Sequence, residues 1–238
     1  MARSSFSQFL RRALYVVVVL VGGVTAVSAQ AERQDFPAVD TFGLPRVESA
    51  KVQALYLDPE ADFSHYQRVA IGNIEVAFRK NWQRDQNRSR RTPGTRITDK
   101  DVERIRLAIA ELFEEVFREE LTAAGYTVEE GPEIAGDTDD LLILLPAILN
   151  LDATAPDKMV AGRTRTFTTS AGSMTLYLEF HDGVGGALLG RALDSRAAPN
   201  TISMSISNAV TNRAEASRMV RHWAGLLVDA LNSARDKP

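Results

Sequence analysis

The stretch between Thr98 and Gly125 constrains the fold more than any other part of the chain, because it predicts one long amphipathic helix. Thr98 is its N-cap, with Asp101 at the capping-box position, and Gly125 ends it as a left-handed cap. Apolar residues recur inside at steps of three and four, which places them on one helical face; they are Val102, Ile105, Ile109, Leu112, Phe113, Val116, Phe117 and Leu121. Such a helix must bury its apolar face against another element.

A second apolar stripe predicts a closing helix near the end of the chain. It begins at a cap at Asn212 and carries Met219, Trp223, Leu226, Leu227, Ala230 and Leu231. Strand patterns fill the remainder, at 66–76 with a bulge at Gly72-Asn73, at 126–128, 141–151 and 167–180, and at 187–193 after a hairpin turn. We therefore predict an α+β fold: a small, mostly antiparallel sheet of four to five strands with two long helices packed on one face.

The apolar run from Leu141 to Leu151 predicts a strand buried on both faces. Pro146 lies inside this run and donates no backbone hydrogen bond. The strand must therefore bend at Pro146 or lie at an edge of the sheet. The small, serine-rich segment 197–208 predicts a loop.

The first 31 residues predict a secretory signal peptide. They hold three arginines and no acid, followed by an uncharged stretch from Ala13 to Ala29. Small residues permit cleavage after Ala29 or after Ala31. The alternative is an uncleaved membrane anchor, for which 17 uncharged residues fall short of the roughly 20 that span a bilayer. Cleavage gives a periplasmic protein without a permanent membrane anchor.

The absence of cysteine excludes several classes of protein. A chain with no cysteine in 238 residues has no disulfide scaffold, no thiolate zinc site, no thiol nucleophile and no lipid-modified N-terminal cysteine. Its net charge of −3 becomes −6 when residues 1–31 are removed, which argues against nucleic acid as a partner. We predict a signal peptide at 1–31, an extended leader at 32–50 and a single α+β domain at 51–238.

The unusual feature of the domain is a basic loop at 79–96. It holds seven cations against Asp85 alone, with Trp82 among them; the cations are Arg79, Lys80, Arg84, Arg88, Arg90, Arg91 and Arg96. Clustered cations beside an aromatic ring can bind an anionic polymer such as lipopolysaccharide or lipid headgroups. The alternative is a solvated charge run that binds nothing.

No catalytic or metal-binding pattern is present in the sequence. The histidines, His65, His181 and His222, have no metal-ligand spacing, and no serine lies in a nucleophile elbow. The acidic segment 131–140 does not match a calcium loop, so it predicts a solvated turn. We predict no cofactor and no metal.

Several stretches between Val52 and Ala234 carry a family resemblance when they are taken in order; they are Tyr56–Tyr66, Asn81-Trp82, Ile97–Asp101, Ala155–Asp157, Ser170–Leu176, Gly190–Asp194 and Trp223. Together they resemble the bacterial envelope family of unknown function DUF3313. The resemblance implies an envelope protein, often a lipoprotein, with no assigned reaction. This chain departs from that pattern because it lacks a cysteine for a lipid anchor.

The function these patterns favour is that of a periplasmic, non-enzymatic binding module, whose partner is an envelope protein or an anionic envelope polymer. One alternative is a hydrolase acting on an envelope polymer, which would need converging carboxylates such as Asp194 or Glu179. The other is direct binding of an anionic polymer by the basic loop.

Overall fold

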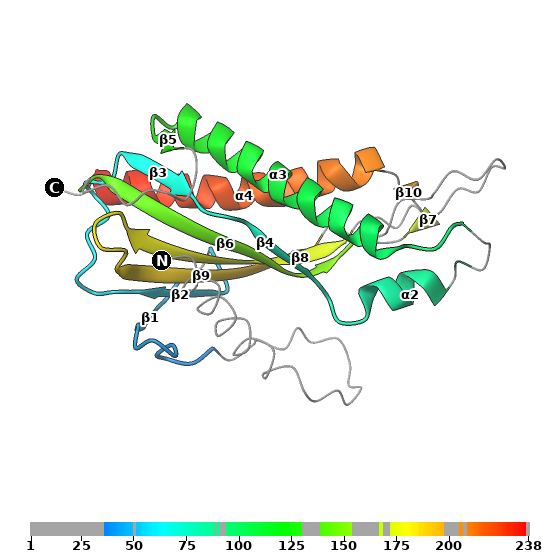
Figure 1. The fold of residues 1–238 in the computed structure, drawn as a ribbon. Coiled ribbons are helices and arrows are strands. Elements are labelled where there is room, and N and C mark those ends of the chain that lie inside the picture. The colour runs from blue at the N-terminus through cyan, green and yellow to red at the C-terminus, as the bar shows by residue number, and fades with distance from the viewer. Residues whose placement is uncertain are drawn as a thin grey trace, which may run out of the picture. The chain divides into compact units, whose positions relative to one another are not determined.

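The domain has the α+β fold that its sequence predicts (Figure 1). The structure is a computed structural model that describes residues 36–49, 51–88, 90, 94–129, 139–153, 167–168, 172–197, 205–206 and 209–236, with backbone only for 167–168, 205–206 and 209–212. The predicted signal peptide lies outside the described residues. The elements are β1 (Arg46–Val47), β2 (Ala54–Leu57), β3 (Arg68–Ile71), β4 (Glu75–Phe78), α2 (Trp82–Arg88), α3 (Asp99–Ala123), β5 (Thr127–Glu129), β6 (Leu141–Asp152), β7 (Phe167–Thr168), β8 (Ser173–Asp182), β9 (Leu188–Ala197), β10 (Ser205–Ile206) and α4 (Ala209–Arg235).

The described strands form a larger and more mixed sheet than the sequence predicts. Eight strands follow the order β1-β2-β9-β8-β6-β3-β5, with β4 also paired to β6, and β10 pairs with β7 separately. The pairs β3–β5, β3–β6 and β4–β6 are parallel. The predicted number of four to five strands is therefore wrong, and the three parallel pairs were not predicted, but the predicted antiparallel pairing holds for the other four pairs of this described sheet. Parallel pairing joins segments far apart in the chain, so local alternation carries no signal for it.

Strands β3 and β4 pair one after the other along the same side of β6, separated by the predicted bulge. Ile71 pairs with Leu144 and Glu75 with Ala147, so residues 72–74 oppose only residues 145–146. This extra residue is what a β-bulge inserts. Pro146 lies opposite the bulge, where pairing with β3 has ended and pairing with β4 has not begun. An interior strand thereby accommodates a residue that has no N–H.

Helices α3 and α4 lie side by side across one face of the sheet (Figure 1). The capping box at the start of α3 is confirmed: the Thr98 side chain accepts from the Asp101 backbone N–H, and Asp101 Oδ2 accepts from the Thr98 N–H at 2.8 Å. Gly125 has the left-handed φ of 91°. The helices bury Phe113, Phe117, Leu121, Val220 and Trp223 against the sheet, together with apolar residues of β6 and β8. This shared core fixes which face of the sheet is covered.

Three local predictions are corrected. The basic segment is not entirely a loop, since α2 forms within it. The segment 197–208 contains β10, and α4 begins at Ala209 rather than at a cap at Asn212. Residues 36–49 contribute β1 and belong to the same compact unit as the domain. Within the described part of the chain, no helix is both long and apolar enough to cross a membrane.

Replacing either of two glycines with alanine should change the free energy of unfolding in opposite directions. A Cβ on Gly190 would lie 2.5 Å from Leu57 Cδ2 and 2.7 Å from the Tyr56 carbonyl oxygen, whereas a Cβ on Gly225 in α4 would touch nothing within 4 Å. We expect Gly190→Ala to lower the free energy of unfolding by about 1–3 kcal/mol, because β2 must move away from β9. Gly225→Ala should raise it by about 0.5–1 kcal/mol. Urea unfolding of both variants checks the pair, and an unchanged Gly190→Ala midpoint would contradict the close packing of β2 on β9.

Candidate functional site

The basic segment is built on a short helix with a buried anchor. Trp82, the first residue of α2, is 2% exposed and stacks on Phe78 at a ring-centroid distance of 4.1 Å. Its indole Nε1 donates to the Ala153 carbonyl oxygen at 2.8 Å, and Ile97 joins the same apolar cluster. Trp82 therefore holds α2 in place. Its ring is buried, so Trp82 is not part of the exposed surface of the basic segment.

Part of the predicted cation set is engaged in contacts within the domain. Arg79 forms ion pairs with Asp85 at 2.8 Å and with Asp152 at 2.7 Å, which join α2 to the end of β6. Arg84 contacts Asp85 at 3.3 Å, and Arg90 donates to the Thr95 carbonyl oxygen. The contacts of Arg79 and Arg90 stabilise the fold of the segment, whereas Arg84 pairs with its sequence neighbour Asp85 and stays exposed.

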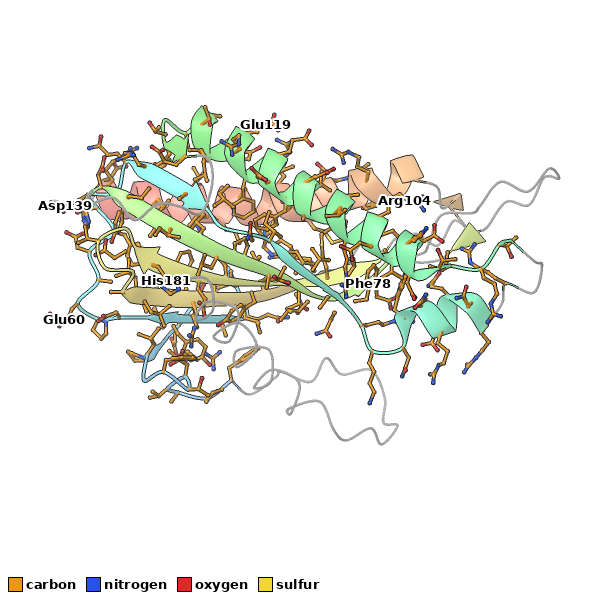
Figure 2. The ribbon with its side chains drawn as sticks, in the orientation of Figure 1. Glu60, Phe78, Arg104, Glu119, Asp139 and His181 are labelled. Carbon is orange, nitrogen blue, oxygen red and sulfur yellow. The ribbon has the colours of Figure 1, made fainter. Side chains whose placement is uncertain are left out.

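The remaining cations are exposed. Lys80, Arg88 and Arg96 are exposed and form no ion pair with any described residue. Side chains tipped with nitrogen project outward from α2 (Figure 2). Arg91 lies outside the described residues. We call Lys80, Arg84, Arg88 and Arg96 the α2 surface, because all four side chains are exposed around this anchored helix.

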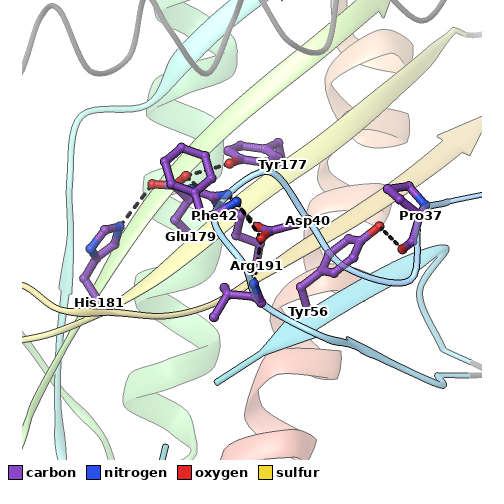
Figure 3. Close-up of polar contacts among 9 residues, drawn as sticks. Pro37, Asp40, Phe42, Tyr56, Tyr177, Glu179, His181 and Arg191 are labelled. Atoms are coloured by element: carbon purple, nitrogen blue, oxygen red, sulfur yellow. Dashed lines mark hydrogen bonds and ion pairs between the residues drawn. The ribbon is translucent and has the colours of Figure 1, made fainter. Parts of the chain in front are cut away.

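A second polar cluster lies on the sheet face opposite to the helices (Figure 3). Arg191 of β9 donates from Nε to Glu179 Oε1 at 2.9 Å and from Nη1 to Asp40 Oδ2 at 2.6 Å. Glu179 Oε1 also accepts from the Tyr177 hydroxyl at 2.6 Å, and Oε2 lies 3.0 Å from His181 Nε2. The side chains of Arg191, Glu179 and Asp40 are less than one-tenth exposed. We call this cluster the Arg191 clamp.

The Arg191 clamp fastens residues 36–49 to the sheet. Asp40 Oδ1 accepts from the backbone N–H groups of Phe42 and Leu44, both at 2.8 Å, which folds this segment into a tight turn. The Phe42 ring covers the Arg191 guanidinium at 3.6 Å, a cation–π contact. Among the described residues, none accepts a hydrogen bond from the buried Arg191 Nη2. No local pattern predicts the pairing of Asp40 with Arg191, since the two residues are 151 positions apart.

The electrostatics of the clamp keep Glu179 ionised. Burial raises the pKa of the Glu179 carboxyl, but hydrogen bonds from His181 and Tyr177 and the charge of Arg191 outweigh it, so the pKa lies below its ordinary value of 4.5. Burial and the nearby Glu179 charge raise the pKa of the Tyr177 hydroxyl. Both oxygens of Glu179 are occupied, so the clamp is suited to holding the fold rather than to proton transfer.

Glu179 and Asp194, the predicted carboxylate candidates for a hydrolase, do not converge. Side chains along a strand alternate between the two faces of a sheet. Asp194 pairs with Leu176 on the helix face, where its Oδ2 accepts from Trp223 Nε1 at 2.8 Å and Arg196 Nε at 2.7 Å. Glu179 pairs with Arg191 on the opposite face. The sheet separates the two carboxylates, so they cannot act on one substrate.

The described histidines and aspartates form no metal site. His181 lies at the hairpin end of β8, as predicted, while His65 stacks on Tyr66 and His222 is exposed on α4. In the acidic turn, Asp139 is exposed and Asp140 lies 3.6 Å from Arg68. The part of the chain that the structure describes brings no three histidine or carboxylate side chains together around a metal position.

Comparison with protein families identifies the chain. A family model described as "Protein of unknown function (DUF3313)" matches residues 42–227. The chain belongs to DUF3313. The predicted resemblance is thereby confirmed, and the match spans α3, β6, β8 and β9 and enters α4. None of the curated proteins matches the sequence.

The residues that suggest DUF3313 membership hold the fold together. Trp82 anchors α2, Thr98 and Asp101 cap α3, and Arg191 forms the clamp. Gly190 allows β2 to approach β9, and Trp223 ties α4 to Asp194. The residues that carry the family resemblance therefore indicate a shared fold and do not point to a reactive group.

Solved structures with similar folds share little sequence with this DUF3313 chain. The PelC dodecamer from Paraburkholderia phytofirmans has 13% identity over 70% of this chain and 92% of that chain, with a TM-score of 0.37. A DUF330 protein from Xanthomonas campestris has 11% identity, coverages of 75% and 90%, and a TM-score of 0.40. A neuraminyllactose-binding hemagglutinin homologue from Helicobacter pylori has 10% identity over 74% of this chain and 87% of that chain, with a TM-score of 0.35. Likeness at this level carries no information on function.

Removal of the Glu179 charge should destabilise the domain in a pH-dependent way. We expect Glu179→Gln to lower the free energy of unfolding by about 3–5 kcal/mol at pH 7, because Arg191 stays buried without its partner. The folded-state pKa of Glu179 lies below 4.5, so its stabilisation is present above that pH and is lost as the pH falls through the folded value. The difference between wild type and variant should therefore shrink below pH 4.5.

Chemical unfolding from pH 3 to pH 8 measures this difference, and Glu48→Gln, at an exposed position, is the matched control. A difference that stays constant across this pH range would show that the Glu179 charge does not contribute.

Proposed function

We propose that this DUF3313 protein is an exported, non-enzymatic binding module that holds an anionic polymer of the cell envelope on its α2 surface. The observation that carries the proposal is the anchoring of α2 by Trp82, which is buried, stacked and hydrogen-bonded. If the cations were only solvated charges that bind nothing, no anchored helix would be required to position them. Here Arg84 and Arg88 extend from a short helix whose position is set by the core, and Lys80 and Arg96 lie on the segments that flank it, so the four cations present a defined pattern.

The spacing of the cations suits a ligand with repeated negative charges. Arg84 and Arg88 are four residues apart on α2, so they lie on one side of it, about 6 Å apart along the axis. Arg96 lies in the turn that leads to α3, and Lys80 precedes α2. Each cation near an anionic surface contributes about 1 kcal/mol to binding. Several together give useful affinity at low ionic strength, although each single contact is weak.

The net negative charge of the rest of the protein also favours binding of an anionic polymer at the α2 surface. After cleavage at Ala31 the chain would carry a net charge of −6, so an anionic polymer is repelled elsewhere and attracted at the α2 surface. That imbalance orients the protein on its ligand. Export explains why an envelope polymer is the relevant anion.

Neutralising the exposed cations should weaken binding to an anionic polymer. We expect Lys80→Gln, Arg88→Gln and Arg96→Gln together to lower the affinity for immobilised lipopolysaccharide about 100-fold at low salt, which is the loss of about 3 kcal/mol. The dependence of binding on salt should become less steep, because fewer counterions are released. Binding at several sodium chloride concentrations measures both quantities.

The matched control replaces Arg213, Arg218 and Arg235 of α4 with glutamine. These arginines are exposed, and the change in net charge is the same. Equal weakening by the two triple variants would show that only total charge matters and would overturn the α2 surface as the site.

Export predicts a specific new N-terminus. We expect the protein recovered from the periplasm to begin at Gln30 or Glu32, following cleavage after Ala29 or Ala31. Mass spectrometry of the intact protein measures this directly. Replacing Ala29 and Ala31 with arginine should block cleavage and leave the full-length chain at the membrane. A cytoplasmic, full-length wild-type protein would contradict export.

A further inference from the structure

An apolar cavity of about 120 Å³ lies between α4 and the helix-facing side of β2, β8 and β9. Its sheet wall includes Leu55, Leu178 and Ala192, and its helix wall includes Leu226 and Ala230. Lys51 lies in the segment before β2 and also lines the cavity. This cavity is separate from the α2 surface and from the Arg191 clamp, and nothing described above occupies it.

The cavity exists because small side chains stand where larger ones would fill the space. Ala192 faces the cavity from β9, and Ala230 faces it from α4. Trp223 and Leu227 pack deeper against the core. An apolar cavity of about 150 Å³ is known to stay dry and to bind benzene. A space of about 120 Å³ therefore has the size for a small ring or a short alkyl chain.

A single carboxylate gives this apolar space a polar feature. Asp194 lines the cavity and is 5% exposed. Its Oδ2 accepts hydrogen bonds from Trp223 Nε1 and Arg196 Nε. Its Oδ1 accepts no hydrogen bond from the described residues, and this atom is not fully buried. Oδ1 is therefore reachable, and an ionised carboxylate oxygen accepts hydrogen bonds only. It would bind a hydroxyl or an N–H group.

The charges around the cavity favour a neutral ligand. Arg196 neutralises Asp194 at 2.7 Å. At the entrance, Lys51 and Asp229 lie 3.5 Å apart, so their charges also balance. A charged ligand would bury its charge in an apolar space where every charged side chain is already paired. Burying an unpaired charge is costly.

We propose that this cavity binds a small neutral amphiphile: a ring or short alkyl chain that carries one hydroxyl or N–H group. The apolar part fills the space between Ala192 and Ala230, and the donor meets Asp194 Oδ1. The proposal is independent of polymer binding at the α2 surface, so either can fail without the other.

The experiment uses p-cresol as the probe and toluene as the matched compound without a donor. The indole N–H of Trp223 is bonded to Asp194, whereas the indole N–H of Trp82 is bonded to Ala153. In ¹H–¹⁵N NMR spectra of the whole protein, p-cresol should shift the Trp223 indole signal in a saturable way and leave the Trp82 signal in place. We expect a dissociation constant of about 0.1–1 mM and binding of toluene about tenfold weaker.

Two variants locate the site. Ala230→Leu should abolish the Trp223 shift by filling the cavity from the helix, and Ala192→Val should reduce it from the sheet. Ala214→Leu, at an exposed position on the same helix, should leave binding unchanged, and the Trp82 signal reports that each variant is folded. The proposal is overturned if p-cresol gives no saturable shift up to about 10 mM. It is also overturned if Ala230→Leu binds as wild type does, or if toluene binds as well as p-cresol.

Discussion

Two long helices share one face of one sheet, and the remaining structure adapts to that constraint. The apolar stripes of α3 and α4 bury against β6 and β8 and form the main core. Every second residue of β8 and β9 consequently points away from the helices, and these residues include Tyr177, Glu179 and Arg191. Because no helix among the described elements covers this face at β8 and β9, the segment 36–49 supplies the cover through Asp40 and Phe42.

The same constraint separates the two candidate sites. The α2 surface lies beyond the shared core, where Trp82 attaches a short helix to Phe78 at the end of β4. The apolar cavity lies where α4 passes over β9 and small side chains leave a gap. One site is exposed and positively charged, and the other is an apolar, partly open pocket whose flanking charges are paired. The two ligands that we propose would therefore bind at separate places and would not compete with each other.

Local signals in the sequence predicted the elements that depend on local interactions. The capping box at Thr98, the stripe that follows it and the hairpin at 182–186 are set by residues a few positions apart, and all three are present. The α+β class follows from them. The parallel pairing of β3 with β6 and the attachment of Asp40 to Arg191 join distant segments, so no window of sequence contains both partners.

The basic segment shows the same division within one candidate site. Composition revealed its seven cations, but it could not separate the arginines that stabilise the segment from those that are exposed. Arg79 is taken up by Asp152, which lies 73 positions later in the chain. The sequence could not show that the Trp82 ring is buried. Its ring stacks on Phe78 and its N–H donates to the Ala153 carbonyl oxygen, and both contacts form only in the fold. A small helix is also hard to see among polar residues, since it has one buried side chain and no stripe.

The position of the clamp has a consequence for the order of assembly. Asp40 leaves the ribosome long before Arg191 does, because synthesis proceeds from the N-terminus. Residues 36–49 must therefore wait without their anchor until β9 has emerged and paired with β8. Closure of this segment therefore cannot precede the pairing of β9 with β8, and until then Tyr177 and Glu179 lack the cover that Asp40 and Phe42 provide.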